Sequence, residues 1–160
     1  MPIRLTKGVA VLAAAALATA AFAEGHMTPE VERAINARQA HMTLYAHNLG
    51  PLGAMAQDQM PYDAEMAAMA AQNLAALAAL SQAGYWVEDS DSDFVEETRA
   101  LPAIWEDMDG VMAEAQKLQE ATAALAEVAG NDLESLKAAF GPVGQACGSC
   151  HRSYRQRDDG

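Results

Sequence analysis

The sequence predicts an all-α protein. Its 160 residues contain only 6% aromatic residues and few β-branched ones, while alanine and methionine are abundant, a composition that favours helices. Apolar residues recur at steps of three and four over four separate segments, and no segment alternates as a half-buried strand would. We therefore expect four helices, no sheet and a single domain.

The first helix is expected over residues 29–49. Thr28 is a suitable N-cap, and Pro29 would occupy the first helical position, where its missing N–H is not needed. Arg38 interrupts the apolar stripe, so its charge needs either a buried partner or a path to water along the arginine stem. The apolar residues of the stripe are Val31, Ile35, Met42, Tyr45 and Leu49, and they follow steps of three and four once Arg38 is included.

The second helix is expected over residues 63–83, after the turn Met60-Pro61-Tyr62. The third begins near Pro102 and continues beyond Leu125. Residues 84–101, which connect these two helices, include an acidic run at 88–93. We expect a solvated loop there, because the run lacks the glycine and the terminal glutamate of an EF-hand calcium loop.

The fourth helix begins where Asn131 and Glu134 form a capping-box-like pair. Pro142 is expected to kink it or to remove one backbone hydrogen bond. One apolar seam steps by three and four along the whole segment. The seam consists of Leu133, Leu136, Phe140, Val143, Cys147, Cys150 and Tyr154.

The end of this helix contains Cys147-Gly148-Ser149-Cys150-His151, the C-x-x-C-H pattern that attaches a c-type haem. Residues three apart share a helix face, so both sulfurs can reach one macrocycle while His151 offers a nitrogen to the iron. These are the only two cysteines, so the pattern predicts one covalently attached haem c.

Other uses of this pattern are less well supported. A thioredoxin-like pair belongs near a βαβ unit, and a zinc site would need further ligands that His26, His41 and His47 do not supply at suitable spacing. A structural disulfide remains an alternative, but it gives His151 no role.

Residues 1–23 have the features of a secretory signal peptide. Arg4 and Lys7 precede an apolar stretch that ends in the small-x-small site Ala21-Phe22-Ala23. The stretch is too short and too alanine-rich for a stable membrane span. We therefore expect a periplasmic protein with one domain over residues 24–160.

The chain is strongly acidic. Its formal net charge of −12 would become −14 without Arg4 and Lys7. Such a charge argues against nucleic acid as a partner and permits steering toward a redox partner with a basic docking surface.

Residues 140–155, together with Arg38-Gln39, Pro61-Tyr62-Asp63 and Ile104-Trp105, resemble the class II cytochromes c, the cytochrome c′ family. The resemblance implies an antiparallel four-helix bundle with a covalently bound haem near the C-terminal helix. It implies His151 as the proximal iron ligand with Arg155 beside it, and a haem propionate as the partner of Arg38. The predicted cofactor-binding residues are Cys147, Cys150, His151, Met42, Arg38, Gln39, Trp105 and Arg155.

Met42 occupies the distal position of the family, and in the low-spin branch a methionine there binds the iron. We predict His151 and Met42 as the two iron ligands. His41 is the competing ligand, but it is rotated by about 100° from Met42, so only one of the two can face the iron. We favour Met42 as the ligand because it lies on the apolar stripe of the predicted first helix.

The predicted function is therefore single-electron transfer between redox partners through a six-coordinate His/Met haem. No acid–base or nucleophile constellation accompanies the haem motif, so we do not expect an enzyme. The alternative is a five-coordinate cytochrome c′ that binds nitric oxide or carbon monoxide at the distal face. Family members often form homodimers through their first two helices, and no exposed apolar seam in the sequence decides that question.

Overall fold

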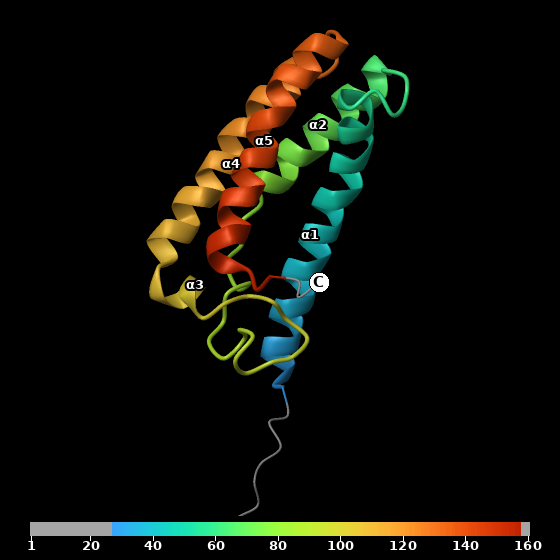
Figure 1. Cartoon of the computed structure of the whole chain (residues 1–160). Helices are drawn as coiled ribbons and strands as arrows, with labels where there is room; N and C mark the ends of the chain where they lie inside the picture. Colours follow the sequence, from blue (N-terminus) through green and yellow to red (C-terminus); the bar gives the residue numbers. More distant parts are fainter. Residues whose placement is uncertain (1–26, 158–160) are drawn as a thin grey trace, which may run out of the picture.

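The computed structural model describes residues 27–157. In that range four long helices run alternately up and down, as Figure 1 shows, and no strand is formed. The helices are α1 (Pro29–Ala56), α2 (Ala64–Ala78), the short α3 (Ala103–Glu106), α4 (Met108–Val128) and α5 (Leu133–Tyr154). The predicted all-α class and antiparallel four-helix bundle are confirmed. The predicted signal peptide at 1–23 lies outside the described residues.

Each long helix begins at a side-chain cap that accepts a hydrogen bond from a backbone N–H of the first turn. The predicted cap of the first helix is confirmed, because Thr28 Oγ1 accepts from Val31 N at 3.3 Å. The start of α5 differs from the prediction by one residue. Asp132, not Asn131, is the N-cap, and its carboxylate accepts from Ser135 N at 2.7 Å.

The first two helices end at other residues than predicted. α1 continues seven residues past Leu49, through Pro51, because Leu52 and Met55 are fully buried on the continued helix. Burial of such side chains outweighs the one hydrogen bond that the proline removes. α2 ends at Ala78 rather than at 83, and Leu80 beyond it is exposed.

The predicted third helix is divided at Asp107. The backbone of this residue leaves the helical region (φ −137°, ψ 57°), and its carboxylate caps α4 by accepting from Gly110 N at 3.0 Å. α3 is consequently a separate short turn that packs against α4 and α5.

The core lies between the four long helices. Leu136 and Val143 are fully buried, and Cys147 packs against the same cluster, which confirms the predicted seam of α5 over most of its length. The other large side chains that are fully buried in this core are Leu52, Met55, Leu74 and Leu125. α5 continues through Pro142 as a helix. Among the described residues, no helix has the length and apolar character needed to cross a membrane.

Candidate cofactor site

The two cysteines lie one turn apart near the C-terminal end of α5. Both are half-buried, and they are free thiols rather than a disulfide. Burial raises the pKa of each thiol, and for Cys150 the neighbouring Glu114 and Cys147 add to the rise. Both sulfurs are therefore protonated at neutral pH, and each is placed for reaction with one planar group.

His151 follows them on the last turn of α5 and is exposed. Partial desolvation lowers the pKa of its imidazole, and the positive charge of Arg155 lowers it further. The neutral imidazole, which is the form that binds a metal, is therefore favoured. The structure thus places Arg155 beside His151, as the resemblance implied.

Two contacts from α4 orient this turn of α5. The Ser149 hydroxyl, which lies between the two cysteines in sequence, donates to Glu114 Oε2 and also lies 3.0 Å from Ala146 O. The Tyr154 hydroxyl donates to Asp107 Oδ2 at 2.7 Å. Sequence reasoning did not identify Glu114 or Asp107, because each is more than thirty residues away from its partner and belongs to no local motif.

Arg38 is almost completely buried (4% exposed), and all the hydrogen bonds described for its side chain reach the connection between α2 and α3. Its Nη1 donates to Tyr85 O and to Ser90 Oγ, both at 2.9 Å. Its Nη2 donates to Thr98 Oγ1 at 2.9 Å and to Ser90 O. Arg38 thus binds the connection between α2 and α3, and the alternative of a guanidinium in water is wrong. That a haem propionate also pairs with Arg38 stays a prediction.

The ring of Trp86 lies under the Arg38 guanidinium, 5.2 Å from its carbon to the ring centroid. Burial lowers the pKa of Arg38 and nearby Asp91 opposes this, but an arginine remains charged in proteins. Arg38 is therefore a buried cation that holds the connection against α1.

Gln39 also binds this connection, since its Nε2 donates to Glu97 O at 2.6 Å. At its other end the connection joins α5. Leu101 N donates to Tyr154 O at 3.0 Å, and Gln156 N donates to Arg99 O at 2.8 Å. The connection thus links α1 to the residues that follow His151.

The buried stripe of α1 passes through His41 and not through Met42. His41 is 4% exposed, stacks on Tyr45 with ring centroids 4.7 Å apart, and places Nε2 3.0 Å from Leu77 O on α2. Because a carbonyl only accepts, Nε2 carries the proton. Met42 is 40% exposed, so the prediction that it belongs to the core stripe is wrong. That Met42 binds the iron stays a prediction.

Two buried donors around this end of the bundle fit a group with acceptor oxygens. Tyr45 Oη and Trp105 Nε1 have no hydrogen-bond partner among the described residues. Burial, with smaller contributions from Cys147 and Tyr85, raises the pKa of Tyr45 to about 12, so its hydroxyl stays protonated. Buried donors normally have partners, and the carboxylates of a haem are suitable acceptors. The residues present therefore fit a haem c.

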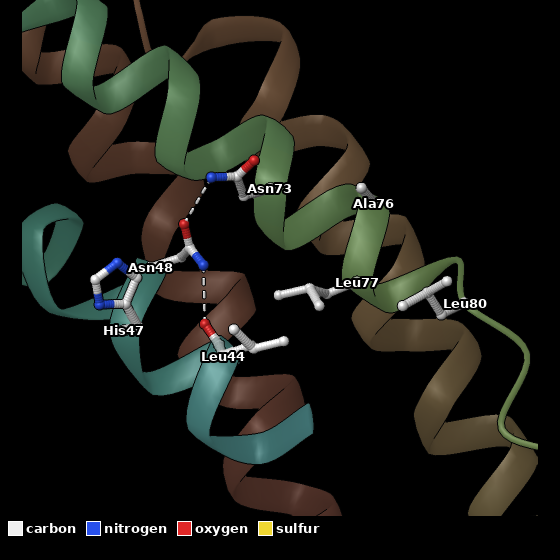
Figure 2. Close-up of a pocket in the computed structure, with 7 residues that line it drawn as sticks. All are labelled: Leu44, His47, Asn48, Asn73, Ala76, Leu77 and Leu80. Atoms are coloured by element: carbon white, nitrogen blue, oxygen red, sulfur yellow. Dashed lines mark hydrogen bonds between the residues drawn. The ribbon is translucent and has the colours of Figure 1, made fainter. Parts of the chain in front are cut away.

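A separate pocket of about 370 Å³ lies between α1 and α2, as Figure 2 shows. Asn48 links its two walls, because Asn73 Nδ2 donates to Asn48 Oδ1 at 3.0 Å and Asn48 Nδ2 donates to Leu44 O at 2.8 Å. Leu77 of α2, and Leu80 just beyond the end of that helix, belong to its apolar lining. No residue of the cysteine motif lines it.

The family model described as Cytochrome C′ matches residues 33–155. A cytochrome c-554 from Cereibacter sphaeroides is 46% identical over 129 residues, which are 81% of this chain and 84% of the relative. A cytochrome c′ from the same organism is 38% identical over 136 residues, 85% of this chain and 91% of the relative.

The chain is also similar to solved structures of cytochromes c′. A cytochrome c′ from Rhodobacter sphaeroides superposes with a TM-score of 0.78 at 38% identity, covering 80% of this chain and 98% of the other. A nitric oxide complex of a cytochrome c′ variant from Alcaligenes xylosoxidans superposes with a TM-score of 0.71 at 31% identity, covering 82% and 99%.

Proposed function

The chain belongs to the cytochrome c′ family, and on that basis we propose that it binds a diatomic gas such as nitric oxide or carbon monoxide at the distal face of its haem. Proteins of this family are periplasmic and carry a covalently attached haem c, for which this chain has the two attachment cysteines. When bound, the haem supplies an iron that changes by one electron and can coordinate a small ligand.

The roles of the chain's residues follow from the geometry of α5. Cys147 and Cys150 hold the macrocycle, and His151 presents a neutral imidazole from the proximal side. The contact between Ser149 and Glu114 keeps the motif turn in one orientation relative to α4. Tyr45 and Trp105 offer buried donors to the edge of the ring. These residues bind and orient the haem, and we propose a binding and carrier protein rather than an enzyme.

One observation favours a distal face on which no side chain of this protein coordinates the iron. Neither side chain that could complete the coordination is held in place for it, because Met42 is off the buried stripe and His41 uses Nε2 for Leu77 O. The solved nitric oxide complex of a related protein supports the same choice.

A six-coordinate His/Met electron carrier is the second candidate. The specific observation in its favour is that Met42 is not packed into the core, so its flexible thioether can change rotamer without leaving a cavity.

Absorption spectra of the holoprotein separate the two candidates. We expect high-spin spectra and a Soret shift when carbon monoxide is added to the ferrous protein, both unchanged in Met42→Ala. The equally simple change Met112→Ala, at an exposed methionine of α4, is the matched control. A far-red ferric band that is present in the wild type and lost only in Met42→Ala would establish the His/Met carrier instead.

Export by residues 1–23 is part of the proposal. We expect the periplasmic holoprotein to begin at Glu24, and its intact mass to exceed that of the chain 24–160 by one haem. A mature chain that retains Arg4 and Lys7 would contradict the signal peptide, and an unmodified mass would contradict covalent attachment.

We also propose that two copies associate through α1 and α2. The exposed side chains of Leu44 and Leu80 beside the pocket of Figure 2 support this. Sedimentation of the wild type and of Leu44→Glu tests it, with Met112→Glu as the control. A wild type that sediments as a monomer at all concentrations would end this proposal.

A further inference from the structure

The connection between α2 and α3 forms a groove with the first turn of α1, away from the cysteine motif. The groove has a volume of about 720 Å³. Its lining includes the apolar side chains of Val31, Trp86, Val87 and Val95 and the ring of Phe94. Phe94 is 68% exposed, which is the largest exposure among the large hydrophobic side chains of residues 27–157. An exposed aromatic ring beside an apolar groove is typical of an interaction site.

The polar rim of this groove is acidic. Glu30, Glu88 and Asp89 line it, all three are exposed, and no lysine or arginine is among the lining residues. Such a surface attracts a cation that also carries apolar area, and it repels anions. We name the set Glu30, Glu88, Asp89 and Phe94 the acidic groove.

Hydrogen bonds and a ring contact connect the acidic groove to α1, α3 and α5. Hydrogen bonds from Arg38 and Gln39 of α1 join α1 to the connection between α2 and α3. Backbone hydrogen bonds of Arg99 and Leu101 join the same connection to the end of α5. Trp86, on the groove wall, lies edge-to-face with Trp105 at 6.3 Å between ring centroids. α3, which carries Trp105, packs against α5. The contact between Trp86 and Trp105, and the packing of α3 against α5, therefore connect the acidic groove to the helix of the cysteine motif.

We propose that the acidic groove is the docking site of a basic redox protein that exchanges one electron with the haem. In that exchange the ferrous iron loses one electron, and the oxidised centre of the partner gains it. The inference rests on the proposed function only in requiring a bound haem. It holds for an open distal face and for a His/Met haem alike.

The test uses tris(1,10-phenanthroline)cobalt(III), a trication with an apolar surface, as the oxidant of the ferrous holoprotein. The variant Glu30→Gln/Glu88→Gln/Asp89→Asn removes the rim charges, and asparagine tolerates the left-handed backbone of Asp89 (φ 58°). We expect the second-order rate constant at about 0.1 M ionic strength, where the Debye length is about 10 Å, to fall by about three- to tenfold through loss of electrostatic steering. With ferricyanide, a trianion, the rate constant is expected to rise.

The matched control is Glu120→Gln/Glu127→Gln/Glu134→Gln, which changes the net charge equally at exposed positions on α4 and α5. Its rate constant with the cobalt complex is expected to stay within about twofold of the wild type, because screening limits surface charges to short range. Phe94→Ala is expected to lower the rate with the cobalt complex and to leave the rate with hexaammineruthenium(III), a hydrophilic trication, unchanged.

An equal loss in the two charge variants, or no loss in the groove variant, would overturn the proposal. A groove variant that becomes monomeric while its rate is unchanged would assign the acidic groove to a second copy of this chain, and so would also overturn it. Haem spectra recorded on the same samples show whether the cofactor site is intact. A protein that binds no carbon monoxide yet shows the charge dependence would refute gas binding and leave the docking site standing.

Discussion

Replacement of Arg38 by methionine is expected to destabilise the protein more than any change at the surface. The substitution keeps the apolar stem and removes the guanidinium, which donates hydrogen bonds to Tyr85, Ser90 and Thr98. Ser90, Thr98 and Asp91 are buried, so they cannot replace these bonds with water. The change therefore removes the cation and leaves its partners unsatisfied.

The structure sets the size of the effect. A hydrogen bond to a charged group contributes about 1.5–3 kcal/mol, and the bonds of one guanidinium are not additive. Loss of one member of a buried charged group costs about 3–5 kcal/mol. We expect a loss in this range, compared with a total stability of about 5–15 kcal/mol for a domain.

Chemical denaturation of the haem-loaded protein, followed by circular dichroism, measures this loss. Arg33→Met is the matched control, because Arg33 is exposed on the same helix. We expect a change within about 0.5 kcal/mol for the control. A loss below about 1 kcal/mol in Arg38→Met would refute the reasoning that these bonds are formed in a dry interior.

Three further changes test the packing of the bundle and its pH dependence. Leu52→Ala, at a fully buried position, should cost about 2–5 kcal/mol in denaturation experiments. Met112→Ala, at an exposed position of α4 outside the proposed dimer interface, should cost almost nothing, and equal losses would contradict the described core. Tyr62→Phe should cost about 1 kcal/mol, because its hydroxyl donates to a backbone carbonyl at the end of α4 at 2.9 Å, and an unchanged melting temperature would contradict that bond. The hydrogen bond from Tyr154, and then that from a backbone N–H, lowers the pKa of Asp107. A carboxylate with a lowered pKa stabilises the fold above its unfolded pKa and loses this contribution as the pH falls through the folded value, so the stability of Asp107→Asn should vary less with pH below about 4. Identical acid unfolding curves for the wild type and Asp107→Asn would contradict this assignment.

The bounds of the helices show where local rules succeed and fail. Thr28 and the seam of α5 were predicted correctly, because a cap and a periodic stripe depend on residues within one or two turns. The extension of α1 through Pro51 was not predicted, because it depends on Leu52 and Met55 being buried by other helices.

The choice between His41 and Met42 shows a deeper limit. Both lie three or four residues from Arg38 and from Tyr45, so either of them completes a stripe with helical spacing. The sequence pattern therefore cannot distinguish them. The stacking on Tyr45 and the contact with Leu77 O on α2 decide the matter in favour of His41 as the buried residue.

The structure of the acidic run at residues 88–93 was also predicted only in part. Its solvated character was predicted from its charge, and Glu88 and Asp89 are indeed exposed. The burial of Asp91, and the groove that the run forms with the first turn of α1, were not predicted. They depend on Arg38, which binds residues up to 60 positions away.

By itself, the sequence determined that the chain is helical and that its last helix has the attachment motif for one haem. Both properties are local, since helical periodicity extends over a few turns and the motif over five residues. The tertiary structure alone decided which face of α1 is buried, which groups accept hydrogen bonds from Arg38, and where an acidic groove lies relative to the motif. Those features arise from contacts between residues that are far apart in the chain, and the free energy of such contacts depends on burial that only the packed helices create.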